Sequence, residues 1–149
     1  MAIVLAVVTV SAMPRFRARW QRVQEERAAF SLAQSLRTAR SLAAAHSRST
    51  AWVWDAQARR MWIGQAQDDG STEPVAGRLG APQALPQDVA VQALQAGQPV
   101  ERIVFLPDGT AQAATVMIGA DPEHPHYAVA VEAATGQVTV TSSLLPTAS

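Results

Sequence analysis

Hydrophobic residues follow different patterns in the two ends of this chain of 149 residues. Residues 1–13 form an apolar run without a charged side chain, and Pro14 closes it. From Arg15 to Ser49 apolar residues recur at helical spacing, and neither glycine nor proline interrupts them. We therefore expect an amphipathic helix over residues 15–49, kinked at Pro14. Its apolar stripe, ready to lie on a sheet, comprises Phe16, Trp20, Val23, Phe30, Leu32, Leu36, Ala39 and Ala43.

After residue 50 the apolar residues alternate over short stretches, as is typical of β-strands. Residues 52–54 and 61–63 predict a hairpin around residues 55–60, with Trp52 and Trp54 on one face. A strand is also expected from Val89 to Ala93. Two further pairs of stretches flank turn residues: residues 103–105 and 113–118 around Pro107-Asp108-Gly109, and residues 127–131 and 137–141 around Ala134-Thr135-Gly136. They predict strand–turn–strand units, the last one a closing hairpin.

Residues 64–87 contain several glycines and prolines and predict a long loop, with a short strand near Val75. A loop of this length is expected to be mobile or functional. The fold class is α+β: a long N-terminal helix packed on an antiparallel β domain. We divide the chain into an apolar segment (1–14), an amphipathic helix (15–49), the β domain (50–142) and a frayed tail (143–149).

The apolar segment is shorter than a membrane span. Thirteen helical residues cover about 20 Å, whereas a bilayer core requires about 20 residues. A signal peptide is disfavoured because no basic residue precedes the run and Ser11-Ala12-Met13-Pro14 is a poor cleavage site. The arginines that follow also oppose translocation of the domain. A few more apolar residues upstream, behind a short basic leader, would resolve both difficulties, so we expect the natural chain to begin before Met1.

The formal net charge of zero conceals an asymmetry. Residues 15–60 carry ten arginines against three acids, and residues 61–149 carry two arginines against nine acids, which gives +7 and −7. Such a basic helix joined to an acidic body is compatible with head-to-tail packing, with phosphate binding, or with a simple solvated helix face. Cysteine is absent, which excludes disulfides and thiolate metal sites and leaves the redox compartment open.

The order of these parts resembles the type IV pilin-like proteins, and the body resembles the minor pseudopilins of the GspH/FimT family. The apolar segment ending at Pro14, the helix segment Leu36–Ala43 with Arg40, and the element Leu85-Pro86 carry this resemblance. Its most specific parts are the phenylalanine–proline–aspartate–glycine turn and the terminal threonine–glycine hairpin. These comprise Phe105, Pro107, Asp108, Gly109, Thr135 and Gly136.

This chain departs from that family at its start. Members begin with a basic leader ending in glycine, followed by an N-methylated phenylalanine and, shortly after it, a glutamate. None of these is present in this sequence. The family's apolar segment begins some eight residues further upstream of its proline, in agreement with the shortfall calculated from bilayer thickness.

The resemblance implies a structural subunit rather than an enzyme, without a cofactor or small-molecule substrate. Such proteins are single-pass proteins of the bacterial inner membrane with the β domain in the periplasm. Their N-terminal helices pack with those of other major and minor pseudopilins in the short filament of a type II secretion system, which drives export of folded proteins across the outer membrane. Trp20, near the expected membrane boundary, is a candidate interfacial anchor or filament contact.

The histidines are the only candidates for catalysis or metal binding. His124 and His126 lie near Asp121 and Glu123, but two prolines break the stretch and no third ligand has a distinctive spacing, so we predict a polar loop without metal. His46 suits the negative end of the helix dipole. Residues 68–71 (Asp-Asp-Gly-Ser) lack the spacing of a helix–loop–helix calcium site and predict an exposed turn.

Two other functions remain as alternatives. The first is a minor type IV pilin for pilus assembly or DNA uptake, which would bind DNA through arginines of the helix and the first hairpin. These are Arg37, Arg40, Arg48, Arg59 and Arg60. The acidic body and the absence of arginine after Arg102 argue against nucleic acid. The second is a membrane-tethered enzyme, for which no catalytic set converges.

Overall fold

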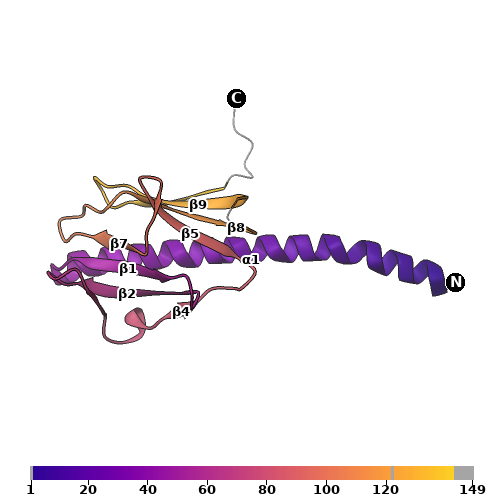
Figure 1. Ribbon diagram of the computed structural model, residues 1–149, viewed down its shortest axis with the longest axis horizontal. Coiled ribbons are helices and arrows are strands. Elements are labelled where there is room, and N and C mark those ends of the chain that lie inside the picture. The colour runs from indigo at the N-terminus through magenta and orange to yellow at the C-terminus, as the bar shows by residue number, and fades with distance from the viewer. Residues whose placement is uncertain (1, 122, 143–149) are drawn as a thin grey trace, which may run out of the picture.

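A single helix, α1 (Ala2–His46), opens the chain and extends well beyond the β domain (Figure 1). The structure, a computed structural model, describes residues 2–121 and 123–142, with the side chains of α1 from Arg19 onward. Met1 and the tail predicted at 143–149 lie outside the described residues. The backbone of α1 remains helical through Pro14. Within the described residues, no helix has both the length and the hydropathy that crossing a membrane requires.

The helix ends three residues before the predicted boundary of residue 49. Ser47 adopts a left-handed conformation with a φ of 52°. The Arg48 amide then donates to the Ala43 carbonyl at 3.3 Å, a bond that closes the last turn of a helix. His46 lies in this last turn, as predicted.

The apolar residues of α1 belong to two opposite faces, which corrects the predicted single stripe. Leu32, Leu36, Ala39 and Ala43 are fully buried against the sheets. At 100° per residue, however, Trp20, Val23 and Phe30 point to the other side, and all three are exposed. The spacing predicted each half correctly, but the register shifts between Phe30 and Leu32. Beyond the packed face, α1 therefore presents a second apolar face to its surroundings.

Sheet A is antiparallel and has the strand order β3–β2–β1–β7. The predicted tryptophan hairpin is confirmed as β1 (Thr50–Asp55) and β2 (Arg60–Ala66). Trp52 and Trp54 are both buried, on the same face. The flanking strands are β7 (Arg102–Phe105), which pairs with β1, and β3 (Thr72–Pro74), which pairs with β2.

Sheet B is also antiparallel, with the order β10–β9–β8–β5–β6. Its strands are β5 (Ala90–Gln95), β6 (Gln98–Pro99), β8 (Ala114–Gly119), β9 (Pro125–Val131) and β10 (Val138–Ser142). The predicted closing hairpin is confirmed, because β9 and β10 pair directly.

The inner faces of the two sheets and the packed face of α1 enclose one core. Trp52 and Phe105 are its largest fully buried side chains, and Val116 and Val129 contribute from sheet B. Figure 1 shows sheet B on one side of α1 and sheet A on the other. This arrangement confirms the predicted α+β class.

The long connection predicted over residues 64–87 is present in part, and the short strand expected near Val75 is confirmed as β3, but the segment holds more regular structure than predicted. Besides β3, it holds a short 3₁₀ helix, η1 (Arg78–Gly80), and β4 (Gln83–Ala84), which pairs with β2. Gly80 lies so close to the Val75 backbone that no Cβ would fit between them. Gly64 and Gly80 thus serve close packing beside β2, whereas Gly70 and Gly77 adopt positive φ in open space, and composition alone does not distinguish the two roles.

The strands on either side of the Pro107-Asp108-Gly109 turn are confirmed, but they belong to different sheets. β7 pairs with β1 in sheet A, whereas β8 pairs with β5 and β9 in sheet B. Only an isolated bridge, Phe105 to Ala111, joins the two arms next to the turn. The turn is therefore the corner at which the chain crosses from one sheet to the other.

Candidate functional site

The two most specific motifs of the pilin-like resemblance lie together at the end of the domain where α1 finishes, whereas Pro14 and Leu85-Pro86 lie elsewhere. The corner turn is a tight one: the Gly109 amide donates to the Leu106 carbonyl at 3.2 Å, and the Leu106 amide donates to the Thr110 carbonyl at 2.9 Å. Proline suits the second position of such a turn, and Gly109 has a φ of 94°, which favours glycine. The spacing of these residues therefore fixes the local backbone.

Asp108 stabilises this turn from within. Its carboxylate accepts hydrogen bonds from the Thr110 hydroxyl at 2.6 Å and the Thr110 amide at 3.0 Å. The hydroxyl bond, followed by the amide bond, lowers the pKa of Asp108, because both donors favour the charged carboxylate. The group is fully exposed to water, so its role is to hold the turn rather than to transfer protons.

A second turn lies beside the first. The Gly136 amide donates to the Glu132 carbonyl at 2.8 Å, and the Thr135 hydroxyl accepts from the Gln137 amide at 3.2 Å. The Ala111 amide donates to the Ala133 carbonyl at 2.9 Å and so ties the two turns together. We call the two turns, residues 106–111 and 132–137, the distal turns.

Arg40 of α1 completes this cluster. A Cβ added to Gly136 would lie 2.8 Å from the Gly109 carbonyl oxygen and 3.3 Å from Arg40 Nε. Gly136 therefore lies close to both the Gly109 carbonyl and the Arg40 side chain. One turn earlier on the helix, Arg37 donates to the Val138 carbonyl at 3.1 Å. The arrangement joins α1 to both turns and contains no acid–base pair.

The five arginines of the nucleic-acid hypothesis are divided between two ends of the domain. Arg37, Arg40 and Arg48 lie toward the end of α1, with Arg48 3.5 Å from Gln65 Oε1. Arg59 and Arg60 lie at the opposite end of the β1–β2 hairpin. Arg59 is partly buried and donates to the backbone carbonyls of two residues of the β4–β5 connection, one of them at 2.8 Å. The structure thus assembles three of the five and uses one internally.

The histidines serve separate contacts. His124 is exposed and pairs with Asp121 at 2.9 Å, and this contact lowers the pKa of Asp121. His126 instead reaches α1, where its Nδ1 lies 2.6 Å from Glu25 Oε2. In the described ranges no three histidine, aspartate or glutamate side chains come close enough to hold a metal ion.

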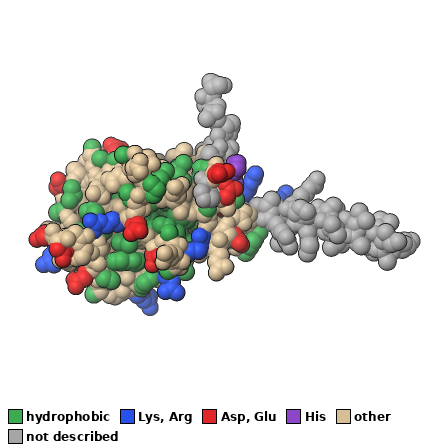
Figure 2. Space-filling view, viewed as in Figure 1, with side chains coloured by type: hydrophobic (Ala, Val, Ile, Leu, Met, Phe, Trp, Pro, Cys, Tyr) green, Lys and Arg blue, Asp and Glu red, His purple; other side chains and the backbone are tan. Residues whose placement is uncertain are grey.

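Glu25 is a functional candidate that the sequence analysis missed. It is fully buried, and its second carboxylate oxygen has no hydrogen-bond partner within the described structure. The signal was present, because residues 25, 29, 32 and 36 share one helix face and Glu25 is the only acid on it. Next to it, burial and the nearby charge of Glu26 raise the pKa of Tyr127. Figure 2 shows acidic, basic and histidine side chains close together where α1 leaves the domain.

The Asp-Asp-Gly-Ser segment is an exposed turn. Asp69 accepts from the Ser71 hydroxyl at 2.6 Å and the Ser71 amide at 2.9 Å, and these bonds lower its pKa. The turn is held in place by Arg102, which donates to the Gly70 carbonyl at 2.7 Å. The Asp69 carboxylate is engaged in hydrogen bonds within this turn, which supports the prediction of an exposed turn and not a calcium site.

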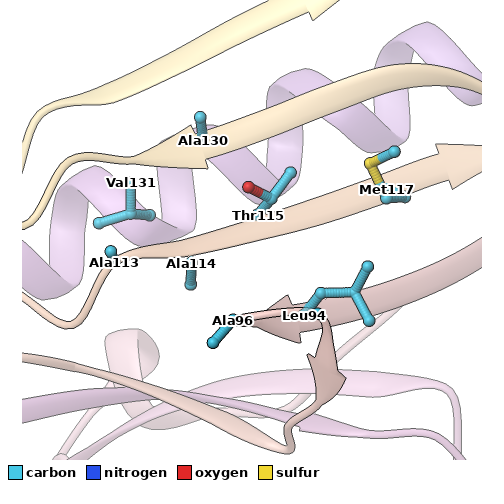
Figure 3. Close-up of a pocket in the computed structure, with 9 residues that line it drawn as sticks. Leu94, Ala96, Ala113, Ala114, Thr115, Met117, Ala130 and Val131 are labelled. Atoms are coloured by element: carbon cyan, nitrogen blue, oxygen red, sulfur yellow. The ribbon is translucent and has the colours of Figure 1, made fainter.

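The outer face of sheet B carries a shallow hollow of about 430 Å³. Figure 3 shows Leu94, Thr115, Met117 and Ala130 lining it, with α1 behind the sheet. None of the lining side chains is charged or can act as an acid, base or nucleophile other than the Thr115 hydroxyl. The hollow therefore offers contact area without chemistry.

A family model described as "Type II transport protein GspH" matches residues 28–141. Among solved structures, the minor pseudopilin EpsH from the type 2 secretion system of Vibrio cholerae matches with a TM-score of 0.67 and 14% identity, over 80% of this chain and 96% of that one. The type IV minor pilin FimU of Pseudomonas aeruginosa matches with a TM-score of 0.62 and 18% identity, over 80% and 90% of the two chains. No curated protein sequence matches significantly.

The two structural likenesses show a shared fold. They confirm the predicted fold, a long helix packed on antiparallel sheets, and together with the family model they confirm the predicted resemblance to the pilin-like GspH family. The family match covers the packed part of α1 and both sheets, and it therefore includes the distal turns.

Proposed function

The chain belongs to the GspH family of type II transport proteins, and from this membership we propose that it is a minor pseudopilin. In this role it is a structural subunit of the pseudopilus of a type II secretion system, which drives export of folded proteins. It would be anchored in the bacterial inner membrane by a single N-terminal segment, with the β domain in the periplasm. The observation that carries the proposal is the continuous helix α1, which extends beyond the domain (Figure 1).

The geometry of α1 suits a filament subunit. Gln21 Nε2 donates to the Asp88 carbonyl at 2.6 Å, and near this residue the helix enters the domain. The outward face with Trp20, Val23 and Phe30 leaves apolar surface that no described part of the chain covers. Apolar surface of this kind is favourably covered by the helices of neighbouring subunits. The partners are therefore other major and minor pseudopilins.

The proposal excludes an enzymatic role. The family and both structural neighbours are pilin-like subunits. The exposed carboxylates of Asp108 in the distal turns and of Asp69 in the Asp-Asp-Gly-Ser turn are engaged in their own turns, an arrangement that supports a scaffold and not a catalytic centre.

Site-directed cross-linking tests the assembly. The chain has no cysteine, so Val23→Cys introduces a unique thiol on the outward face of α1. We expect it to cross-link to another pseudopilin in cells, whereas the matched exposed control Thr139→Cys on β10 does not. A cross-link to the control position alone would contradict packing through α1.

Deletion of the gene distinguishes the type of filament. We expect loss of secretion of a folded exoprotein, restored by the wild-type gene, with pilus-dependent motility unchanged. Loss of motility with normal secretion would instead indicate a type IV pilus.

The alternative is a minor type IV pilin, with DNA uptake as its most specific form, and the likeness to FimU favours keeping it. Three arginines near the end of α1, Arg37, Arg40 and Arg48, are the basic residues that this alternative would use for DNA phosphates. A gel shift with duplex DNA at low salt tests it: binding that falls steeply with salt and is lost in the triple glutamine variant would support this alternative. The minor-pseudopilin proposal predicts no such shift.

A further inference from the structure

The charged residues in the N-terminal half of α1, ahead of the domain, are all positive. Before residue 24 the charged side chains are all arginines, at positions 15, 17, 19 and 22. The first acids are Glu25 and Glu26. Glu25 is turned inward to His126, and Glu26 is exposed. The uninterrupted run of positive charges therefore ends near the point at which α1 enters the domain, and Arg27 follows the two acids.

Three exposed residues mark this boundary, and we call Arg19, Trp20 and Arg22 the neck residues. Trp20 is 52% exposed, a large fraction for an indole ring. Neither guanidinium has a hydrogen-bond or ion-pair partner in the described part of the chain. Their positive charge and the indole are therefore available to a partner outside this domain.

We infer that the neck residues bind the headgroups of anionic phospholipids at the membrane surface. The inference rests on the proposed membrane-attached subunit. Arg19 lies six residues beyond the apolar run 1–13, about 9 Å along the helix, which is the depth of a headgroup layer. Guanidinium groups bind phosphates through paired hydrogen bonds, and tryptophan prefers the membrane–water interface.

The order of charges favours a membrane over nucleic acid. A membrane surface crossed by α1 contacts the residues on the N-terminal side of the neck, where the charges are all positive. A duplex lying along α1 would also meet Glu26, four residues from Arg22, as well as the acidic body. Anionic headgroups attract nearby arginines by about fivefold in affinity per residue. Binding to headgroups would also account for arginines on the translocated side of a segment, where the usual charge bias disfavours them.

Vesicle binding by the full chain tests the inference. The probes are vesicles of phosphatidylcholine alone and vesicles with about one third phosphatidylglycerol, at low and moderate salt. We expect clearly tighter binding to the anionic vesicles. Arg19→Gln/Arg22→Gln should weaken that binding by about 30-fold. The control Arg48→Gln/Arg60→Gln removes two exposed arginines elsewhere and should change it by less than about twofold. Arg19→Lys/Arg22→Lys, which keeps the charge, should retain most of the binding.

Tryptophan quenching adds a positional readout. Lipids brominated near the headgroup should quench the fluorescence of the wild-type chain in anionic vesicles, and Trp20→Phe should remove most of this quenching. Trp52 and Trp54 are buried in the core and should contribute little.

Several outcomes would overturn the inference. They are equal binding to both kinds of vesicle, equal losses in the two double glutamine variants, or a loss of self-association or DNA binding in Arg19→Gln/Arg22→Gln with vesicle binding unchanged. Equal binding to both vesicles leaves the membrane-attached subunit intact. Failure to bind either kind of vesicle contradicts the membrane attachment itself, so the two failures are distinguishable.

Discussion

The two ends of the domain hold α1 by different kinds of interaction. At the distal turns, backbone hydrogen bonds and two glycines bring Arg40 of the helix against the chain. At the other end, where α1 leaves the domain, a different contact holds the helix, and we call it the neck pair. Oε2 of the fully buried Glu25 lies 2.6 Å from Nδ1 of His126. A buried ionisable pair depends strongly on both partners, whereas a backbone cluster depends on shape. One end is therefore sensitive to loss of charge and the other to added volume.

The two ends also differ in what they hold: one fixes the C-terminal end of α1, and the other affects the direction of its extended part. The distal turns fix the end of α1 to the corner where the chain changes sheets. The neck pair holds the helix against the first residues of β9, where α1 leaves the domain. Its location suits control over the angle of the extended helix, and the neck is the end at which the proposed function requires contact with neighbours.

The largest expected effect comes from removing the imidazole. His126→Leu leaves Glu25 buried without its partner, and we expect a loss of about 3 kcal/mol in the free energy of unfolding, measured by urea denaturation. Glu25→Leu/His126→Leu should recover most of this loss, because no isolated charge remains.

A matched control keeps this result specific to the neck. His124→Leu breaks the exposed contact with Asp121 and should leave the unfolding midpoint unchanged within error. Equal losses in the two histidine variants would show that burial of Glu25 does not determine the effect.

A smaller loss is expected at the distal turns. Gly136 has a φ of 68°, and an added Cβ would approach the Gly109 carbonyl oxygen to 2.8 Å. Gly136→Ala should therefore lower the free energy of unfolding by about 2 kcal/mol. Gly97 has a similar φ of 79° with open space around it, so Gly97→Ala isolates the cost of the backbone angle, about 1 kcal/mol. If both variants lose the same amount, the contact with Gly109 carries no energy.

The same contrast determines what could be predicted from the sequence. The distal turns depend on local signals, since Pro107-Asp108-Gly109 and Thr135-Gly136 specify their own backbone angles. That the two turns lie side by side was not predicted, because contact between them depends on the topology of two sheets. The placement of β7 and β8 in different sheets could not be predicted for the same reason, because turn residues specify a chain reversal but not the partner of each strand.

The contact between Glu25 and His126 was not predicted, for a physical reason. Glu25 and His126 are separated by 101 positions, and each is polar enough to be assigned to the surface when considered alone. The apolar spacing of α1 also predicted one face where there are two, because Trp20 and Phe30 are as hydrophobic as Leu32. Burial by a second subunit produces the same sequence pattern as burial within one chain.

A third prediction compares the two ends by pH. Burial, together with Glu26 and Glu25, raises the pKa of Tyr127 at the neck. The folded chain thus retains the phenol proton to higher pH than the unfolded chain does, so stability falls as pH rises above about 10. Tyr127→Phe should reduce this alkaline loss and leave stability at pH 7 nearly unchanged. Urea midpoints at pH 7 and between about pH 9.5 and 11 measure it, and an unchanged alkaline slope would contradict the assignment.

The smallest expected effect concerns Asp108 in the distal turns, at acid pH. The Thr110 hydroxyl and amide lower the pKa of Asp108, so the folded chain releases this proton at lower pH than the unfolded chain. The resulting stabilisation is present above about pH 4 and is lost as the pH falls below it.

Asp108→Asn keeps the acceptor oxygen for Thr110 but does not titrate, so the variant should lose less stability than wild type between about pH 4 and 2. Because the carboxylate is fully exposed, water screens the interaction and the difference should be small. Thermal midpoints in that range measure it, with Asp69→Asn as the control in a similar turn that does not contact α1. An acid slope reduced by Asp69→Asn and not by Asp108→Asn would show that the turn beside α1 gains nothing from its charge, and that the distal end is held by shape alone.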